Sequence, residues 1–295
     1  MAPAAATNLP SPNIMLLLYV LMGTLVPWCV ASSSESLRGR YSFSLSTFDP
    51  SGRLAQVEHA STAASLGPPV AAVALASGRG AVAASLFASP GPLVDDDGTA
   101  RFVRITDSIA VAHSGVSADG RAVVSAAQRM AIEYGYTFDG GGDTEGGELP
   151  IDVFLEEVSD LFQRYTMKAG CRPFGCSLLV LHLPASPALS GRKDCRIYRI
   201  DPSGSVEMAG PICCIGGGDD RAPKIVRALE ERGCSDAASL EEAEEIMLEV
   251  LRDVLGSSPV TKRPRLSFLC SSMTRSGGLS VRKVSSPTRR EGGEG

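Results

Sequence analysis

The chain has 295 residues, 44% of them hydrophobic, so it is long enough to bury one large core or two modest ones. Its formal net charge of −5 excludes a general electrostatic attraction for nucleic acid. Its eight cysteines lack compact spacing and zinc-site partners, which favours buried, reduced thiols over a disulfide framework.

The N-terminal segment 1–39 is expected to lie outside the folded domain. Residues 14–30 are apolar and are followed by Ala31 and a run of serines, as in a signal peptide. No Lys or Arg precedes them, the run is short for a membrane-spanning helix, and Pro27 interrupts it. Three interpretations stay open: a cleaved targeting segment, an extension or gene-model artefact, and a retained anchor.

The next segment combines an extended arm, a turn and an amphipathic helix. Bulky residues alternate from Tyr41 to Leu45, which predicts an extended arm with one apolar face. Residues 48–52 predict a chain reversal, because their proline presets φ and their glycine tolerates positive φ. Residues 54–66 carry apolar side chains at helical spacing up to the Gly-Pro-Pro sequence at 67–69. We expect that this helix is not covered by its own chain.

Strands and helices are then predicted in alternating groups. Apolar runs around turn residues predict strands at 70–87 (a hairpin around Gly78-Arg79-Gly80), 101–105, 109–113, 176–183, 196–200, 205–208, 266–270 and 279–284. Helical periodicity and capping residues predict helices at 117–134, 150–165, 223–231 and 239–255. This order predicts an α+β fold, in which helices cover the outer sides of two antiparallel sheets.

Three segments raise the question of a ligand site or signal. Residues 138–148 are acidic and glycine-rich, but their irregular spacing favours a solvated loop over a calcium site. Gly216-Gly217-Gly218 lacks the spacing of a phosphate loop and precedes two aspartates, which would repel phosphate. Residues 262–265 indicate a nuclear import patch or a solvated basic connector. His113 and His182 have no evident metal partner, so we expect no metal and no cofactor.

The segment 48–60 resembles the N-terminal signature of proteasome α-type subunits: an aromatic residue, Ser-Pro-x-Gly-Arg/Lys, two residues, Gln, a hydrophobic residue and Glu-Tyr-Ala. Asp49 replaces the serine of this signature, and His59 replaces the tyrosine. Residues 40–44 most resemble the α2 type, and the sequences RPFGCSLLV at 172–180 and DPSG at 201–204 extend the resemblance. The matching signature residues are Phe48, Pro50, Gly52, Arg53, Gln56, Val57, Glu58 and Ala60.

The resemblance implies one α-type subunit domain over residues 40–285. Its fold would be the four-layer αββα sandwich of N-terminal-nucleophile hydrolases, preceded by the α-subunit helix. The family also has a closing helix, but residues 286–295 are poor helix formers and are expected to form a disordered basic tail.

The resemblance also implies that the chain has no catalytic residues. In the catalytic β subunits, the nucleophile is the N-terminal threonine of the mature chain. An ungapped alignment with them places Pro69 at the nucleophile position, Ser85 at that of an orienting aspartate and Arg101 at that of a lysine. Proline has no hydroxyl, and an arginine, with its pKa above 12, is poorly suited to tune a neighbouring proton. We therefore expect a structural and gating subunit of a threonine-type endopeptidase complex.

In the family, seven α subunits form a ring whose N-terminal arms close the pore. The expected partners are other α subunits, β-ring subunits and regulatory or ATPase caps, with no nucleic acid and no membrane. Arg101 would bind the C-terminal carboxylate of a cap in a pocket between subunits, or else only extend along a sheet edge. The gate residues would be Tyr41, Ser42, Pro50, Gly52 and His59, and the ring-packing residues Leu54, Gln56, Val57 and Glu58.

Two other functions stay open. A processed N-terminal-nucleophile amidohydrolase would need cleavage before a Ser, Thr or Cys that begins a strand, whereas Thr62 and Ser65 lie inside the predicted helix. A diverged paralogue that no longer assembles is suggested by the leader, by His59 and by the missing closing helix. The expected location is the cytoplasm and nucleus, or a secretory or organellar lumen if residues 14–31 are a real signal.

Overall fold

The computed structural model describes residues 47–77, 80–88, 101–138, 149–168, 170–183, 195–256, 266–274 and 278–285. The chain divides into two units, residues 1–56 and residues 57–295. The described part of the first unit, residues 47–56, comprises a turn and the first residues of helix α2 (Ala55–Ser65). The remaining elements belong to the second unit.

The strands of the second unit form two five-stranded sheets in which each described pairing is antiparallel. The first sheet has the order β10-β9-β2-β1-β8, with β1 (Val70–Ala74), β2 (Gly80–Ala88), β8 (Ile212–Ile215), β9 (Leu266–Thr274) and β10 (Gly278–Ser285). The second has the order β3-β4-β5-β6-β7, with β3 (Phe102–Arg104), β4 (Ile109–Gly115), β5 (Cys176–His182), β6 (Arg196–Ile200) and β7 (Val206–Met208).

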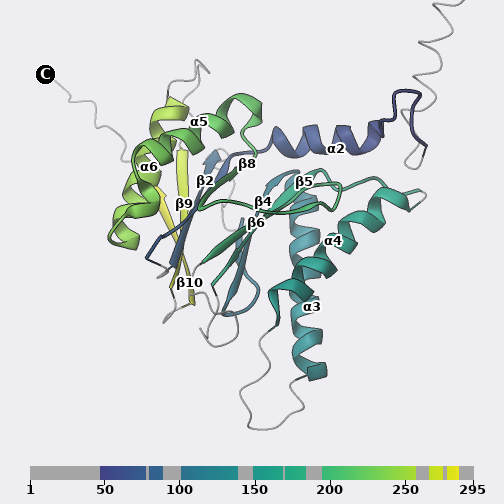
Figure 1. Ribbon diagram of the computed structural model, residues 1–295, viewed down its shortest axis with the longest axis horizontal. Coiled ribbons are helices and arrows are strands. Elements are labelled where there is room, and N and C mark those ends of the chain that lie inside the picture. Colours follow the sequence, from purple (N-terminus) through teal and green to yellow (C-terminus); the bar gives the residue numbers. More distant parts are fainter. Residues whose placement is uncertain are drawn as a thin grey trace, which may run out of the picture. The chain divides into compact units, whose positions relative to one another are not determined.

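Two pairs of helices lie on opposite sides of the second unit (Figure 1). One pair is α3 (Ser117–Phe138) and α4 (Ile151–Met167), which pack on the second sheet. The other is α5 (Gly218–Glu231) and α6 (Leu240–Gly256), which pack on the first sheet together with the short helix η2 (Cys234–Asp236).

Strand β1 shows how the core is divided, because its alternate residues point to opposite faces of the sheet. Val70 and Ala72 join an inner cluster that includes Leu179 of the second sheet. Ala71 and Val73 join an outer cluster with α5 and α6. All five residues of β1 are buried, as expected for a strand that is covered on both faces. The order of layers is therefore helices, sheet, sheet and helices.

The α+β prediction is confirmed, and each predicted strand pair is present. The start of α5 was predicted wrongly, because Pro223 looks like the first residue of a helix. The helix begins five residues earlier, at Gly218, and contains Pro223. Gly216 and Gly217 have φ values of 72° and 80°, so they turn the chain directly from β8 into the helix.

Helix α6 begins as predicted, after a capping box. Ser239 Oγ accepts a hydrogen bond of 3.2 Å from the Glu242 amide, and Glu242 Oε2 accepts one of 2.9 Å from the Ala238 amide. The first bond satisfies a backbone donor that the first helical turn leaves without a helical partner, and the second satisfies the amide of Ala238, which precedes the N-cap.

Several predictions concern residues outside the described ranges. These are the segment 1–39, the arm with Tyr41 and Ser42, most of the loop 138–148, the basic segment 262–265 and the tail 286–295. Among the described residues, none of the helices has the length and hydrophobicity needed to cross a membrane. The described cysteine side chains are free thiols, and burial raises the pKa of Cys214 to about 12, so this thiol stays protonated near neutral pH.

Candidate functional site

The linker Gly67-Pro68-Pro69 joins α2 to β1 and is bound to both sheets through its three carbonyl groups. The Gly67 carbonyl accepts a hydrogen bond of 2.7 Å from the Gly217 amide, which follows β8. The Pro68 carbonyl accepts one of 2.7 Å from Ser114 Oγ on β4, and the Pro69 carbonyl accepts one of 3.1 Å from Ser85 Oγ on β2. The donors come from three separate segments, so the linker is fixed in position.

Pro69 and Ser85, two of the residues aligned with the catalytic positions of β subunits, are in contact. The Ser85 side chain is fully buried and donates its hydroxyl to the Pro69 carbonyl, so this hydroxyl holds the backbone in place. Arg101, the third aligned residue, bonds through its carbonyl to the His113 amide at 3.3 Å. In this arrangement the Ser85 hydroxyl supports the linker.

Helix α2 packs directly on backbone at the point where β4 ends and β5 begins. A Cβ atom added to Gly115 would lie 3.0 Å from the Ala64 Cα and 2.3 Å from the Gly175 carbonyl oxygen. A Cβ atom added to Gly67 would lie 2.1 Å from the Gly115 nitrogen. Ala60 and Ala64 are buried on the helix side of this contact. The close approach therefore depends on small residues on both surfaces.

This packing contradicts in part the prediction that α2 is not covered by its own chain. The alanines of the apolar stripe, Ala60 and Ala64, face the chain's own sheets, because they are small enough to rest on the glycine backbone. Within the second unit, His59 and Leu66 are exposed. Of the predicted ring-packing residues, Leu54 precedes the helix, whereas Gln56, Val57 and Glu58 lie in its first turn.

The predicted chain reversal is confirmed in the first unit, where Asp49 closes the turn. Its Oδ1 accepts hydrogen bonds from the Ser51 amide at 2.8 Å, from Ser51 Oγ at 2.6 Å and from the Arg53 amide at 2.9 Å. The bond from the Ser51 hydroxyl is the main reason why the pKa of Asp49 lies below its usual value. Gly52 has a φ of 79°. The proposed gate residues Pro50 and Gly52 thus lie in a turn that the Asp49 carboxylate closes.

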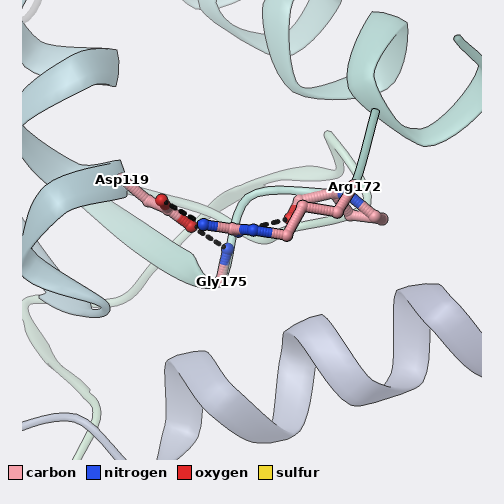
Figure 2. A network of polar contacts seen from close by, with 4 residues as sticks. Asp119, Arg172 and Gly175 are labelled. Atoms are coloured by element: carbon pink, nitrogen blue, oxygen red, sulfur yellow. Dashed lines mark hydrogen bonds and ion pairs between the residues drawn. The ribbon is translucent and has the colours of Figure 1, made fainter. Parts of the chain in front are cut away.

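A second polar contact, which the sequence did not reveal, joins α3 to the segment before β5 (Figure 2). Asp119 accepts hydrogen bonds from Arg172 Nη1 at 2.6 Å and Nη2 at 2.8 Å, and from the Gly175 amide at 2.9 Å. The Arg172 hydrogen bonds are the main reason why the pKa of Asp119 is lowered. Gly175 also faces Ala63 of α2, so this contact supports the surface on which α2 rests.

Asp119→Asn is expected to lower the free energy of unfolding by about 2 kcal/mol. Breaking a buried ion pair costs about 3–5 kcal/mol. Here the Arg172 side chain is 64% exposed, so water can hydrate its guanidinium when the pair is lost, which reduces the cost. Urea unfolding measures the change. The matched control is Glu231→Gln in the exposed pair with Arg227, where we expect about 0.5 kcal/mol or less. Equal losses in the two variants would contradict a structural role for the Asp119 contact.

Arg101 directly precedes the edge strand β3 and His113 lies on the neighbouring strand β4; both are buried, at 6% and 1% exposure. The His113 ring rests against α3, because a Cβ atom on Gly120 would lie 2.2 Å from its Nδ1. Burial, with smaller contributions from the charges of Arg101 and Arg121, lowers the pKa of His113 to about 4. The imidazole is therefore neutral at pH 7. Among the described residues, no group of three His, Cys, Asp or Glu side chains could hold a metal ion.

Comparison with known proteins agrees with this geometry. The family model described as proteasome subunit matches residues 69–263, so the match begins at Pro69. The chain is 35% identical over 164 residues to proteasome subunit alpha type-2 of Trypanosoma brucei brucei, and 34% identical over 166 residues to alpha type-2-A of Arabidopsis thaliana. Each of these matches covers 56% of this chain and 64% of the relative, so the chain spans less than two thirds of their length.

A longer match extends the similarity. The chain is 32% identical over 213 residues to proteasome subunit alpha type-2 of Caenorhabditis elegans, which is 72% of this chain and 83% of that relative. The family model and these relatives agree on the same class of protein. The chain therefore belongs to the proteasome subunit family, and within that family it resembles the subunits named alpha type-2.

Proposed function

We propose that the chain is a non-catalytic α-ring subunit of the proteasome core particle. In this role it forms part of the outer ring, gates substrate entry and docks regulatory caps in ubiquitin-dependent protein degradation. The layers of helices and sheets would then be the αββα sandwich of N-terminal-nucleophile hydrolases. We place the protein in the cytoplasm and nucleus, with other α subunits, β-ring subunits and caps as its partners.

The observation that carries this proposal is the position of Pro69. Its carbonyl is held by Ser85 on β2, and its nitrogen is bonded to Pro68 in a linker that both sheets hold. A catalytic subunit would need a free amine and a hydroxyl or thiol at this position. Helix α2 precedes the linker and rests on Gly115, so the fold has a structural use for the residues that a processed enzyme would remove.

The alternative of a processed amidohydrolase gains no support from its two candidate nucleophiles. Both lie in α2 and donate their hydroxyls to carbonyls of the helix: Thr62 to Glu58 at 2.9 Å, and Ser65 to Thr62 at 2.9 Å. Neither begins a strand. Intact-mass measurement and N-terminal sequencing of the native protein test this alternative, which a mature chain starting at either residue would restore.

Assembly provides the decisive test of the proposed function. The native chain, carrying a small affinity tag at the C-terminus, is expected to co-purify with β subunits and with six other α-type chains. The matched control is the same tag on a variant that lacks residues 47–66. A chain that purifies alone, as a monomer, would favour the diverged paralogue that no longer assembles.

Arg101→Ala is expected to leave ring assembly intact and to weaken activation by caps that insert a C-terminal tail. The reason is the loss of the guanidinium that we propose to bind the tail's carboxylate. Because Arg101 is 6% exposed, binding would require its guanidinium to reach the subunit boundary in the ring. Peptide hydrolysis by the assembled particle, with and without such a cap, measures the effect.

The matched control for Arg101→Ala is Arg104→Ala, on the adjoining strand β3. Arg104 is exposed and forms an ion pair with Asp107, so its loss should not affect activation. Arg101→Lys should retain part of the activation, because lysine keeps the positive charge. It should not retain all of it, because lysine cannot bind a carboxylate in a bidentate manner. Full activation of Arg101→Ala would disprove the role in carboxylate binding.

A further inference from the structure

A cavity of about 270 Å³ with both polar and apolar lining lies between α2, the second sheet and the start of α5. Its apolar lining includes Ile215 and Ala222. Its polar lining comes from four elements and the turn after β6, and the residues used below are Ser61, Ser65, Ser177, Arg199, Asp201 and Asp219.

Ser177, on β5, is the buried polar group of this cavity. It is 7% exposed, and its hydroxyl has no hydrogen-bond partner among the described residues. Leu179, two residues further along β5, belongs to the cluster between the sheets, so strand alternation directs Ser177 to the same side. No contact among the described residues occupies this hydroxyl and it lines the cavity, so it is available to hydrogen-bond a ligand there.

The charges around the cavity show which ligand would fit. Arg199 binds Asp201 through two hydrogen bonds of 2.9 and 3.1 Å, so this pair is close to neutral. Asp219, in the first turn of α5, forms no ion pair among the residues that the structure describes. Its carboxylate leaves the lining with a net negative charge, which opposes an anion even though the helix N-terminus is near.

The hydroxyl groups add acceptors to this negative lining. Ser65 Oγ donates to the Thr62 carbonyl and keeps its lone pairs free to accept. The hydroxyls of Ser61 and Ser177 have no partner among the described residues and accept equally well. The polar groups of the cavity that have no partner among the described residues therefore mostly offer oxygen atoms that can accept hydrogen bonds.

We propose that this cavity binds a primary ammonium group on a short alkyl stem. An ammonium group carries one positive charge and three N–H donors, which match the Asp219 carboxylate and the hydroxyls of Ser177 and Ser61. The stem would lie against Ile215 and Ala222. The ammonium group would belong either to a lysine side chain of a neighbouring chain or to a free aliphatic amine. The site does not depend on the proteasome assignment.

Titration of the full chain with n-butylammonium, with n-butanol as the neutral control, tests the proposal. At constant ionic strength we expect saturable shifts of the Gly216 and Gly218 amide resonances with n-butylammonium and none with n-butanol. Because the Asp219 carboxylate is exposed, Asp219→Asn should weaken binding by about two- to fivefold, and Ser177→Ala by a similar factor. The matched control is Asp220→Asn, which removes the adjacent carboxylate from the same helical turn but does not line the cavity.

Each outcome of this titration decides for or against the site. Equal binding of n-butanol, equal losses in Asp219→Asn and Asp220→Asn, or no saturable shift would overturn the proposal. Saturation-transfer NMR on the assembled particle then separates the two sources. Loss of n-butylammonium binding on assembly identifies a neighbouring lysine, whereas retained binding identifies free amines.

Discussion

Gly67→Ala is expected to release helix α2 from the sheets while the two sheets remain folded. The new Cβ atom would lie 2.1 Å from the Gly115 nitrogen and 2.6 Å from its Cα, and neither backbone atom can move aside as a flexible side chain can. Overpacking costs about 1–3 kcal/mol where side chains can adjust, so we expect at least about 3 kcal/mol here. The strain is relieved most simply if residues 57–69 leave their place.

Hydrogen exchange measures this release directly. A loss of about 3 kcal/mol corresponds to roughly 100-fold faster exchange of the α2 amides, while the amides of β1 and β5 should change little. The variant should also fail to enter the ring, if the proposed function is right. Gly135→Ala is the matched control, because a Cβ atom there meets nothing within 4 Å and the residue lies in α3.

The control is expected to change stability in the opposite direction. Alanine in a helix interior is favoured over glycine by about 1 kcal/mol, so Gly135→Ala should stabilise the chain slightly. If α2 in Gly67→Ala exchanges at the wild-type rate, the backbone contact with Gly115 does not hold the helix in place.

The prediction from sequence succeeded where the information was local. Strands such as β1 and β2 follow from apolar runs on either side of a glycine-rich turn, and α6 follows from its capping box at Ser239. The start of α5 was missed because proline is a strong local signal for a first helical residue. The left-handed glycines before it allowed an earlier start, which the apolar periodicity did not reveal.

The site could be predicted only in part, because its contacts join residues that are distant in sequence. Both members of the ion pair between Asp119 and Arg172 were visible, one in a predicted helix and one in the RPFG sequence, but their pairing across 53 positions was not. The alanine stripe of α2 looked uncovered because its partner is glycine backbone. Glycine contributes no apolar side chain from which a covering surface could be recognised.

Lowering the pH from 7 to 4 is expected to destabilise the chain through His113. The pKa of this buried imidazole is about 4 in the folded chain, against 6.5 for the ordinary group. Above pH 6.5 both states are neutral and the full stability is present. Between pH 6.5 and 4, the unfolded chain binds a proton that the folded chain does not, so stability falls as the pH falls. At 1.36 kcal/mol for each pKa unit, the loss amounts to about 3 kcal/mol.

Urea unfolding of wild type and His113→Asn between pH 7 and pH 4.5 isolates this contribution. Asparagine does not titrate, so the variant should lose much less stability over this range, whatever the substitution costs at pH 7. The ion pair of Asp119 adds little slope here, because its lowered carboxyl pKa matters only below about pH 4. The matched control is His59→Gln, since His59 is exposed on α2 and should leave the wild-type slope unchanged. Equal slopes in wild type and His113→Asn would show that the buried imidazole is not the group that titrates.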